Sequence, residues 1–568
     1  MHGECGGALN LTNPLQGRAG WTTLARMIPV AVLRSARLAV LFLCASAAAL
    51  SAADAPQMER GRGLYLQHCF YCHQADGQGS PGTFPALAKS DFMMADRERA
   101  IRILCEGIGG EIVVNGEKYN GRMPVPVVDD AQAADLLTFV LNSWGNSAPA
   151  VAAAEIKAER AKSRFPTYEA LLKSADFAPL PKPPKGWALR EVARLPASPT
   201  RLASDGTGKV LYALALNGDV FRVDAATGNT RPLFRAKNYL DAKLGEAQAL
   251  GMTMDKKRRL YIVVNQQNEA ERPVQCEVTI FRTTDEIGGD PFAPQSWLQT
   301  KYPFGHGPFN HGVNHIEVGP DGKLYVSSGA RTDGNEKSSD PRFSSEGETP
   351  LTACLWRIDP DAAQPKIEIH ARGLRNTYDF CWDDKGRIIG TENGPNADAP
   401  EELNVIEPGG HYGFPFQFAD WKNKPYPHTP ATPVNLKITL PVLNLGPAAG
   451  GSPQQAMSTF DPHSSPSGVV WLDNQFPVGW RGTVLVARYG NMATLEKDAG
   501  FDLLQARLEK KGDRWQASFT TVLAPLARPI DLHLGPGKVF IAEYTRTTDQ
   551  KSGLPMLSGR ILEMSVQK

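Results

Sequence analysis

The chain has 568 residues, which is too long for one ordinary hydrophobic core, so we expect two or more domains. Its 61 basic and 60 acidic residues give a formal net charge of +1, and it contains no polybasic tract, so we expect no nucleic-acid partner. The 53 glycines and 44 prolines favour a turn-rich protein with much β structure.

The first 55 residues have the pattern of an N-terminal extension followed by a secretory signal. Arg34 precedes an apolar run from Leu38 to Ala49, and small residues follow the run. The run is too short to span a membrane, and we expect no later segment to span one either. We expect Met27 to be the true start and residues 1–55 to be removed, which would leave a periplasmic protein with no spanning segment.

Residues 69–73 read Cys-Phe-Tyr-Cys-His. Two thiols at this spacing can form thioethers with the two vinyl groups of a haem, and the next histidine can then bind the iron. We therefore predict that Cys69 and Cys72 attach a haem c covalently and that His73 is an axial ligand. The alternative is a Cys-x-x-Cys redox pair or half of a zinc site.

A second axial ligand is expected further along the same domain. Met123 lies 50 positions after His73, in a Met-Pro turn that could present its sulfur from a loop. His/Met ligation raises the reduction potential of a cytochrome c. Met93 and Met94 are the alternatives, but they fall in a helix predicted over 91–102. The sequence therefore favours Met123.

Helices are predicted on both sides of this region. Helical spacing of apolar residues covers 57–68, and Asp129 and Asp130 can cap a helix that ends near Leu141. A helix, the CxxCH motif, a long loop, a Met-Pro turn and a closing helix together resemble a class I cytochrome c over residues 56–146. The resemblance implies a small all-α domain that carries electrons.

Residues 147–185 change in composition and read as a connector. An alanine-rich stretch leads into a charged segment with a short helix, and the segment ends in Pro-Leu-Pro-Lys-Pro-Pro-Lys. Elsewhere, Cys354 and Cys381 could form a disulfide in an oxidising compartment, or remain buried thiols.

Residues 186–568 contain a weak internal repeat. A turn of Asp, Gly and Lys type precedes a short apolar strand at six places, near residues 205–212, 255–261, 321–326, 384–389, 481–486 and 535–540. Units of this length, with little helical periodicity, predict a six-bladed β-propeller. The alternative is an irregular array of β-sandwich sheets.

The loops of this domain carry three specific motifs, which are Gly-Leu-Arg-Asn at 373–376, Glu-Asn-Gly-Pro at 392–395 and Gly-Gly-His-Tyr-Gly at 409–413. On these residues the domain resembles the glucose/sorbosone dehydrogenase family, whose six-bladed soluble quinoproteins use pyrroloquinoline quinone (PQQ) and calcium. Matching stretches are spread over roughly 190–565. A cytochrome c fused to such a domain would be a quinohaemoprotein.

The resemblance implies a catalytic base. In this family a histidine lies eight positions before a Gly-Pro-Asp-Gly turn, and His311 holds that position. Histidine is the usual side chain for removing a hydroxyl proton near neutral pH. The family usually has two glycines soon afterwards, where this chain has Val313 and Asn314. His315 is the alternative base, but it falls within a predicted strand.

Arg375 and Asn376 match the family's Arg-Asn pair beside the quinone. A guanidinium can bind a carboxylate or a quinone oxygen with its planar fork. The alternative is a surface ion pair between Arg375 and either Asp379 or Asp383.

Two further basic residues match positions near the cofactor. Arg528 matches an arginine that binds a PQQ carboxylate, although Ile530 stands where the family often has a second arginine. Arg488 lies near the position of another basic cofactor ligand.

Calcium prefers hard oxygen ligands, including backbone carbonyls. The resemblance implies that the carbonyls of Gly394 and Pro395 bind calcium beside the quinone. Asp398, Glu401 and Glu402 add acidity nearby, or form a solvated loop.

Together these features predict a dehydrogenase that oxidises a sugar, aldehyde or alcohol, with His311 taking the hydroxyl proton. Electrons would pass to the chain's own haem and then to an external acceptor such as a cytochrome or oxidase. We expect the insertions at 421–430 and 440–455 to set substrate specificity. The alternatives are a cytochrome fused to a non-catalytic ligand-binding propeller, and a calcium-dependent lactonase-like hydrolase.

Overall fold

The computed structural model describes residues 54–567, apart from 75, 80–81, 83, 175–177, 246, 285–292, 306–309, 339–340, 344–346, 422–423, 425, 491–498 and 546–556. Almost all of the expected signal segment therefore lies outside the described residues. Within the described part of the chain, none of the helices is both long enough and apolar enough to cross a bilayer.

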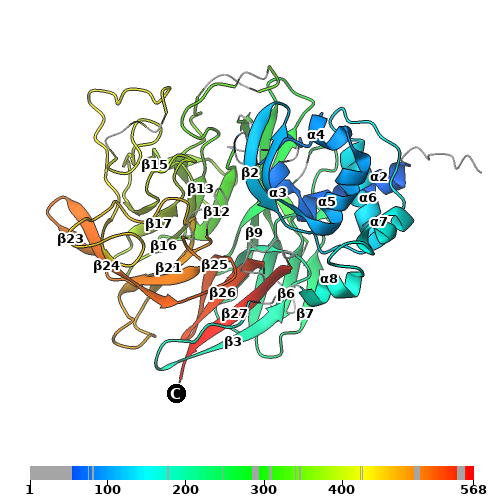
Figure 1. The fold of residues 1–568 in the computed structure, drawn as a ribbon. Coiled ribbons are helices and arrows are strands. Elements are labelled where there is room, and N and C mark those ends of the chain that lie inside the picture. The colour runs from blue at the N-terminus through cyan, green and yellow to red at the C-terminus, as the bar shows by residue number, and fades with distance from the viewer. Residues whose placement is uncertain are drawn as a thin grey trace, which may run out of the picture. The chain divides into compact units, whose positions relative to one another are not determined.

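The N-terminal domain is mainly helical, with one β-hairpin (Figure 1). Its elements are α2 (Ala55–His68), α3 (Phe70–His73), α4 (Asp91–Met94), α5 (Arg97–Glu106), β1 (Ile108–Val114), β2 (Glu117–Met123), α6 (Asp130–Leu141), α7 (Ala153–Arg160) and α8 (Tyr168–Ser174). The Asp54 carboxylate caps α2, and Asp129 forms a capping box with Gln132 at the start of α6. The expected helices on both sides of the CxxCH motif are therefore confirmed.

Two details of this domain differ from the sequence predictions. The single helix expected over 91–102 is wrong, because Asp96 caps a separate helix, α5, and the chain turns between α4 and α5. The long loop expected before Met123 contains the antiparallel hairpin β1–β2, in which Ile108 pairs with Met123. Met123 is thus the last residue of a strand, held by the hairpin and followed by Pro124.

The core of this domain forms where α2, α5, α6 and α7 pack together. Tyr65, Leu104 and Leu136 are buried in it. Val151 and Ile156, which belong to the segment expected as a connector, are buried in the same core. The start of that segment therefore stabilises the helical domain.

The second domain is a six-bladed β-propeller, counted over the residues that the structure describes (Figure 1). The first blade consists of β4 (Pro199–Ser204), β5 (Val210–Ala215), β6 (Val220–Asp224) and β7 (Thr230–Phe234). The second consists of β8 (Ala247–Met254), β9 (Leu260–Asn268), β10 (Gln275–Arg282) and β11 (Gln295–Pro303). The third consists of β12 (Val313–Val318), β13 (Leu324–Ser328), β14 (Cys354–Ile358) and β15 (Glu368–Arg372). A short 3-10 helix, η1 (Ala236–Asn238), follows β7.

The fourth blade is β16 (Thr377–Trp382), β17 (Ile388–Glu392) and β18 (Glu402–Ile406). The fifth combines β20 (Pro466–Leu472), β21 (Thr483–Arg488), β22 (Asp502–Ala506) and β24 (Arg514–Leu523) with β19 (Leu443–Pro447) and β23 (Glu509–Lys511). The last blade is β25 (Pro529–Gly535), β26 (Lys538–Thr545), β27 (Ser558–Val566) and β3 (Trp187–Arg194).

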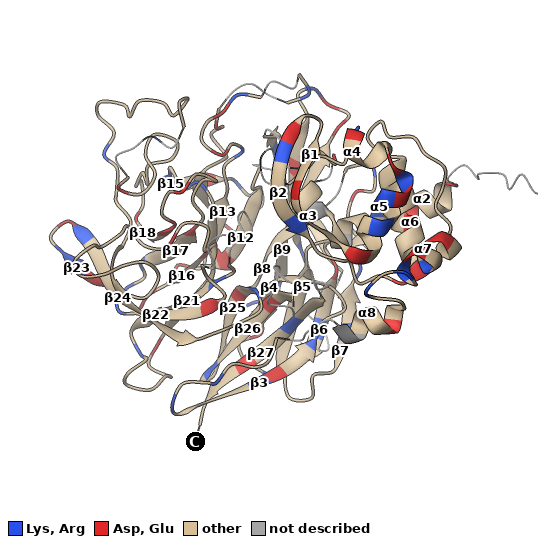
Figure 2. Ribbon diagram, viewed as in Figure 1, with Lys and Arg blue, Asp and Glu red and all other residues tan. Residues whose placement is uncertain are grey.

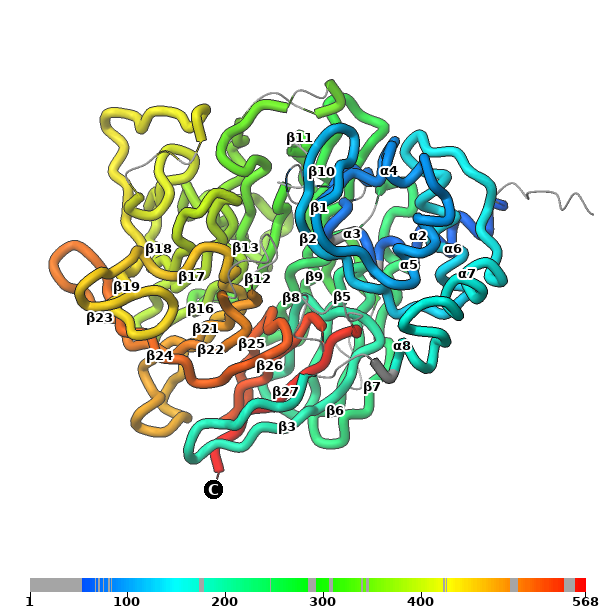
Figure 3. Tube along the Cα trace, viewed as in Figure 1, coloured from blue at the N-terminus to red at the C-terminus, as the bar shows by residue number. Residues whose placement is uncertain are grey.

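The last blade closes the ring. Its outer strand β3 comes from the start of the domain and pairs antiparallel with β27 from the end of the chain, with Trp187 opposite Val566 (Figure 3). The hydrogen bonds between these strands join the two ends of the propeller domain within one sheet and so close the ring of blades.

The six repeats expected from the sequence all fall on one structural position. They are β5, β9, β13, β17, β21 and β26, the second strand of each blade. These strands are almost wholly buried, as β21 shows along its whole length. Because neighbouring blades cover both faces, the strands read as continuous apolar runs rather than as alternating patterns. Charged residues of both signs are interspersed along the ribbon (Figure 2).

The four cysteines outside the CxxCH motif that the structure describes are free thiols. Cys105, Cys276, Cys354 and Cys381 form no disulfide in the described part of the chain. The possible Cys354–Cys381 bridge is therefore not formed.

Candidate functional site

A cavity of about 250 Å³ lies beside the CxxCH motif. Its lining includes Cys69, Cys72, His73 and Met123, with apolar walls from the helices and from the β1–β2 hairpin. The structure therefore brings together all four residues predicted to hold a haem. An apolar cavity with thiols and an imidazole on one wall fits a covalently attached haem.

The orientation of His73 also fits an iron ligand. Its Nδ1 lies 3.0 Å from the carbonyl oxygen of Pro85. A carbonyl can only accept, so Nδ1 carries the proton and Nε2 keeps a lone pair that can bind a metal. Burial lowers the pKa of His73 and so favours the neutral form that metal binding requires.

Met123 and Met93 both line the cavity, whereas Met94 packs against the helical core. Met123 is fixed by the hairpin register and Met93 lies on the short helix α4. The structure thus keeps Met123 as the predicted ligand and Met93 as its alternative.

Propeller residues complete the wall of this cavity. The helical domain and the propeller belong to one compact unit, and Tyr489, Tyr544 and Ser558 of the propeller line the cavity together with Cys72. The positive charge of Arg528 opposes the rise that burial causes in the pKa of the Cys72 thiol. A haem bound here would therefore have a propeller surface at its edge.

The predicted base and the residues predicted to bind PQQ and calcium come from four blades but lie at one end of the propeller. Neighbouring strands of a blade are antiparallel, so the start of the first strand and the end of the second share an end. His311 precedes β12, Arg375 precedes β16 and Arg528 precedes β25. Gly394 follows β17, and Arg488 ends β21.

His311 is held as a proton acceptor. Its Nδ1 lies 2.9 Å from the carbonyl oxygen of Ala330, so Nδ1 carries the proton and Nε2 presents a lone pair. Burial, and next the charge of Arg375, lower the pKa of His311 to about 3. The side chain is therefore neutral, the form that a general base needs, over the whole physiological range.

The two residues that depart from the family pattern have structural roles. Val313 is buried in the core between blades, and Asn314 donates a hydrogen bond of 2.7 Å to the Asn376 side chain. A Cβ at Gly329 would lie 2.6 Å from the Cβ of His311 and 3.2 Å from Oδ1 of Asn376. Only glycine at 329 lets these segments approach so closely, which leaves His311 and Asn376 side by side.

Arg375 is 3% exposed and forms an ion pair with Asp333, which was not predicted. Its Nε donates to the backbone oxygen of Asp333 and its Nη1 to that of Asn393, both at 2.9 Å. The surface ion pair considered as an alternative, with Asp379 or Asp383, is therefore wrong. The three contacts use three of the five guanidinium N–H groups.

The turn predicted to bind calcium is fixed by a buried carboxylate. Glu401 accepts hydrogen bonds from the backbone N–H of Gly394, at 3.0 Å, and of Ser465, at 3.4 Å. Burial raises the pKa of Glu401 to about 7. Among the described residues, no three or more His, Cys, Asp and Glu side chains form a metal-binding group. A calcium ion here would depend on backbone carbonyls, as predicted for Gly394 and Pro395.

Arg488 already has two acidic partners. Its Nε and Nη2 lie 2.9 and 2.8 Å from the Asp502 carboxylate, and its Nη1 lies 3.1 Å from Asp461. A cofactor carboxylate could bind Arg488 only by replacing one of these bonds.

Arg528 lies close to two aromatic rings. Its guanidinium carbon is 4.8 Å from the ring centre of Tyr489 and 5.0 Å from that of Phe501. Ile530, which stands where the family often has a second arginine, is buried with Tyr489 and Tyr544 in an apolar cluster. The missing arginine is thus replaced by packing close to the haem cavity.

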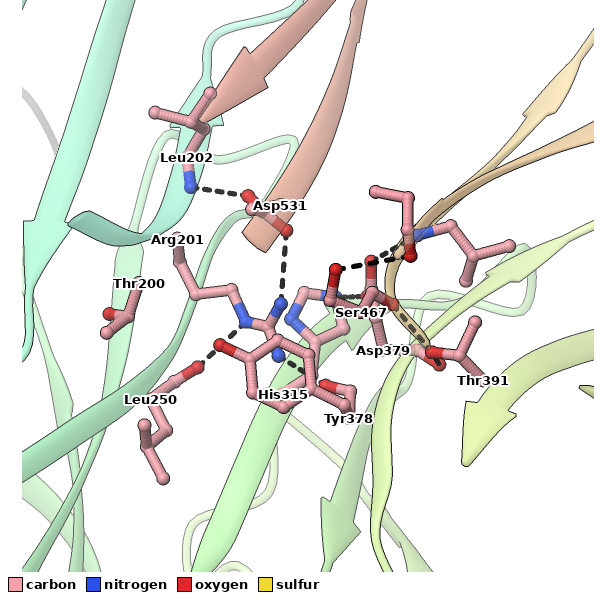
Figure 4. Close-up of polar contacts among 12 residues, drawn as sticks. Thr200, Arg201, Leu202, Leu250, His315, Tyr378, Asp379, Thr391, Ser467 and Asp531 are labelled. Carbon is pink, nitrogen blue, oxygen red and sulfur yellow. Dashed lines mark hydrogen bonds and ion pairs between the residues drawn. The ribbon is translucent and has the colours of Figure 1, made fainter. Parts of the chain in front are cut away.

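A second polar cluster, the axial network, links the first strands of the blades (Figure 4). Arg201 on β4 forms an ion pair of 3.1 Å with Asp531 on β25. It also donates to the backbone oxygens of Leu250, at 2.8 Å, and of Tyr378. Asp531 accepts from the Leu202 N–H at 2.7 Å.

The other half of the axial network centres on Asp379 of β16. Its Oδ1 lies 3.1 Å from Nε2 of His315, and its Oδ2 accepts from the Val469 N–H at 2.7 Å. Ser467 donates to the backbone oxygen of Pro529 at 2.8 Å. Most of these bonds join first strands of successive blades, and the bond from Arg201 to Tyr378 joins the first blade to the fourth, so together they hold the blades to one another around the axis.

Comparison with protein families identifies both domains. The profile described as Glucose / Sorbosone dehydrogenase matches residues 247–500, and that described as Cytochrome c matches residues 58–144. These matches fall on the propeller and on the helical domain.

Individual relatives match one domain each. Cytochrome c-552 of Thermus thermophilus is 35% identical over 140 residues, which are 23% of this chain and 90% of that protein. Quinoprotein glucose dehydrogenase B of Acinetobacter calcoaceticus is 21% identical over 224 residues, which are 35% of this chain and 46% of that protein. A PQQ-bound aldose sugar dehydrogenase from Streptomyces coelicolor aligns with 68% of this chain and 99% of its own, at 22% identity and a TM-score of 0.43.

Proposed function

Because the chain belongs to the cytochrome c family through residues 58–144 and carries a glucose/sorbosone dehydrogenase domain, we propose that it is a periplasmic quinohaemoprotein dehydrogenase. Its substrate would be a sugar first of all, or a related aldehyde or alcohol. The observation that carries the proposal is the position of the haem cavity. Tyr489 and Tyr544 form part of its wall and come from the propeller end that also holds His311.

His311 would take the hydroxyl proton of the substrate at Nε2. Its Nδ1–H bond to the backbone oxygen of Ala330 fixes this tautomer, and its lowered pKa keeps Nε2 unprotonated. PQQ, when bound, supplies the hydride acceptor. Arg375 and Arg528 would bind the anionic and quinone oxygens of that cofactor, and the carbonyls of Gly394 and Pro395 would hold calcium.

The helical domain would receive the electrons. Cys69 and Cys72 would attach the haem, while His73 and Met123 would bind its iron. Haem iron, when present, accepts one electron at a time. Fusion of the two domains raises the effective concentration of the acceptor, so no encounter with a separate cytochrome is needed for the first transfer. An external cytochrome or oxidase would then reoxidise the haem.

The test uses the protein matured with haem in a periplasm and oxidised before the assay. Sugars, aldehydes and alcohols are added with calcium, with or without PQQ, and haem absorbance reports reduction. We expect reduction that requires both PQQ and a sugar and that is lost in His311→Gln, whose haem dithionite still reduces. No reduction together with no PQQ binding would leave the non-catalytic propeller, and turnover of lactones without PQQ would favour the hydrolase.

A further inference from the structure

Asp333 lies where three segments meet near His311, and none of the sequence motifs includes it. We propose that Asp333 and Tyr426 form a clamp that positions Arg375 and anchors residues 426–430, the described end of the insertion, at the propeller end that holds His311. The inference rests on the proposed function and adds to it the residues that would couple this insertion to the cofactor site.

The first part of the clamp is the ion pair with Arg375. The Asp333 carboxylate binds Nη2 of Arg375, and the Asp333 backbone oxygen accepts from Nε at 2.9 Å. The two side chains are 7% and 4% exposed. One aspartate therefore binds two of the three guanidinium nitrogens, and the two opposite charges offset each other before any cofactor binds.

The second part is the turn that follows β17. The backbone N–H of Asn396 donates to Oδ1 of Asp333 at 3.2 Å, and Nη1 of Arg375 donates to the backbone oxygen of Asn393 at 2.9 Å. The ion pair thus holds this turn on both sides of Gly394 and Pro395. Movement of Asp333 would disturb the arginine and the turn together.

The third part is the insertion. The Tyr426 hydroxyl donates to Oδ2 of Asp333 and accepts from the backbone N–H of Ala397 at 3.1 Å. The ring stacks on His428, with centroids 5.1 Å apart. A Cβ at Gly334 would lie 2.2 Å from the Tyr426 ring, so glycine at 334 is what admits the ring. Tyr426 thereby joins the insertion to the residue that fixes Arg375.

These contacts separate two effects. Tyr426 joins the insertion to Asp333, so loss of its hydroxyl should release residues 426–430 and weaken substrate binding. Asp333 also fixes Arg375, so its loss should reduce turnover as well. A residue that only stabilised the fold would change the amount of folded protein without separating KM from kcat.

The experiment compares Tyr426→Phe, Gly334→Ala and Asp333→Asn in the haem-loaded full chain, by PQQ-dependent haem reduction with the best sugar of the panel. The matched control is Tyr325→Phe, which also removes a tyrosine hydroxyl bonded to an aspartate, Asp321 at 3.3 Å, beside the turn between β12 and β13 at the other end of the propeller. Haem absorbance and thermal melting establish folding of each variant.

We expect Tyr426→Phe and Gly334→Ala to raise KM about tenfold with kcat within about twofold, the loss typical of one hydrogen bond to a charged group. Asp333→Asn should lower kcat about tenfold or more in addition. Tyr325→Phe should match the wild type.

Two results would overturn the proposal. One is that all three variants keep the KM and kcat of Tyr325→Phe. The other is that all three lose kcat equally at unchanged KM. A wild-type protein without sugar-dependent haem reduction would instead refute the proposed function, so the two failures are distinguishable.

Discussion

Two of the buried Arg–Asp ion pairs in the propeller are chemically alike and differ in what surrounds them. Arg201–Asp531 lies in the axial network, and Arg375–Asp333 lies near His311. All four side chains are 7% exposed or less. Both pairs are therefore removed from water, and in each pair the loss of one partner would leave a buried charge without its counter-ion.

Their other contacts separate their roles. Arg201 binds the backbone of Leu250 and Tyr378, on or beside first strands of other blades (Figure 4). Arg375 and Asp333 bind a turn and an insertion, through Asn393 and Tyr426. A buried ion pair that joins the strands of different blades stabilises the propeller, whereas a similar pair that binds loops near His311 fixes the position of residues in the candidate site. Burial alone could not have distinguished them.

Replacement of the axial arginine should have the largest effect on folding. Arg201→Met leaves Asp531 buried without its cation, and we expect a loss of about 3–5 kcal/mol in the free energy of unfolding. Urea denaturation of the propeller measures this loss. A change below about 1 kcal/mol would contradict the structural role given to the axial pair.

Replacement of the other arginine should act mainly on activity. Gln at 375 can still donate to Asp333, so Arg375→Gln should fold. We expect PQQ-dependent haem reduction to fall by on the order of 100-fold, as for loss of one electrostatic donor at a reacting centre. Steady-state rates with sugar measure this, and dithionite reduction of the haem is the control. Unchanged activity would place Arg375 with Arg201 as a structural residue.

The axial carboxylate offers a pH test of the same distinction. Burial raises the pKa of Asp379 to about 8. The folded state therefore holds an extra proton between about pH 4 and pH 8, and the stability linked to it is lost as pH rises through that window. Asp379→Asn should remove this part of the slope, measured as urea midpoints of both proteins from pH 5 to 8. Parallel slopes would show that Asp379 does not titrate in this way.

The smallest expected effect concerns the imidazole of His311, which should not titrate near neutral pH. His311 has a pKa of about 3, so its Nε2 stays unprotonated as pH falls from 8 to 5. The NMR signal of its imidazole, identified by its loss in His311→Gln, should not move over that range. A midpoint near 6.5, the ordinary value for histidine, would mean that His311 is more exposed to solvent than the structure shows.

The sequence was most informative where chemistry is local. Five consecutive residues predict the haem attachment, and Asp129 and Asp130 predict the start of α6, where the structure adds Gln132 as the partner in a capping box. The propeller repeats could be identified because each second strand is covered on both faces and so forms an apolar run. In contrast, 91–102 was predicted as one helix because helical periodicity outweighed the capping role of Asp96.

The two ion pairs could not be predicted in the same way. Arg201 and Asp531 are 330 positions apart, and Arg375 and Asp333 are 42 apart. No spacing rule joins such residues, because ring closure brings the first pair together and the packing of neighbouring blades brings the second pair together. The resemblance supplied Arg375 but not its partner, and Tyr426 became visible only through its contacts.

The central claim is that electrons pass from the propeller to the haem within one chain. Stopped-flow absorbance of the oxidised, haem-loaded protein, mixed with PQQ, calcium and sugar, tests it most directly. We predict haem reduction whose first-order rate constant does not change over a tenfold range of protein concentration. A rate constant that rises in proportion to protein concentration would mean transfer between molecules, and no reduction at all would contradict the dehydrogenase itself.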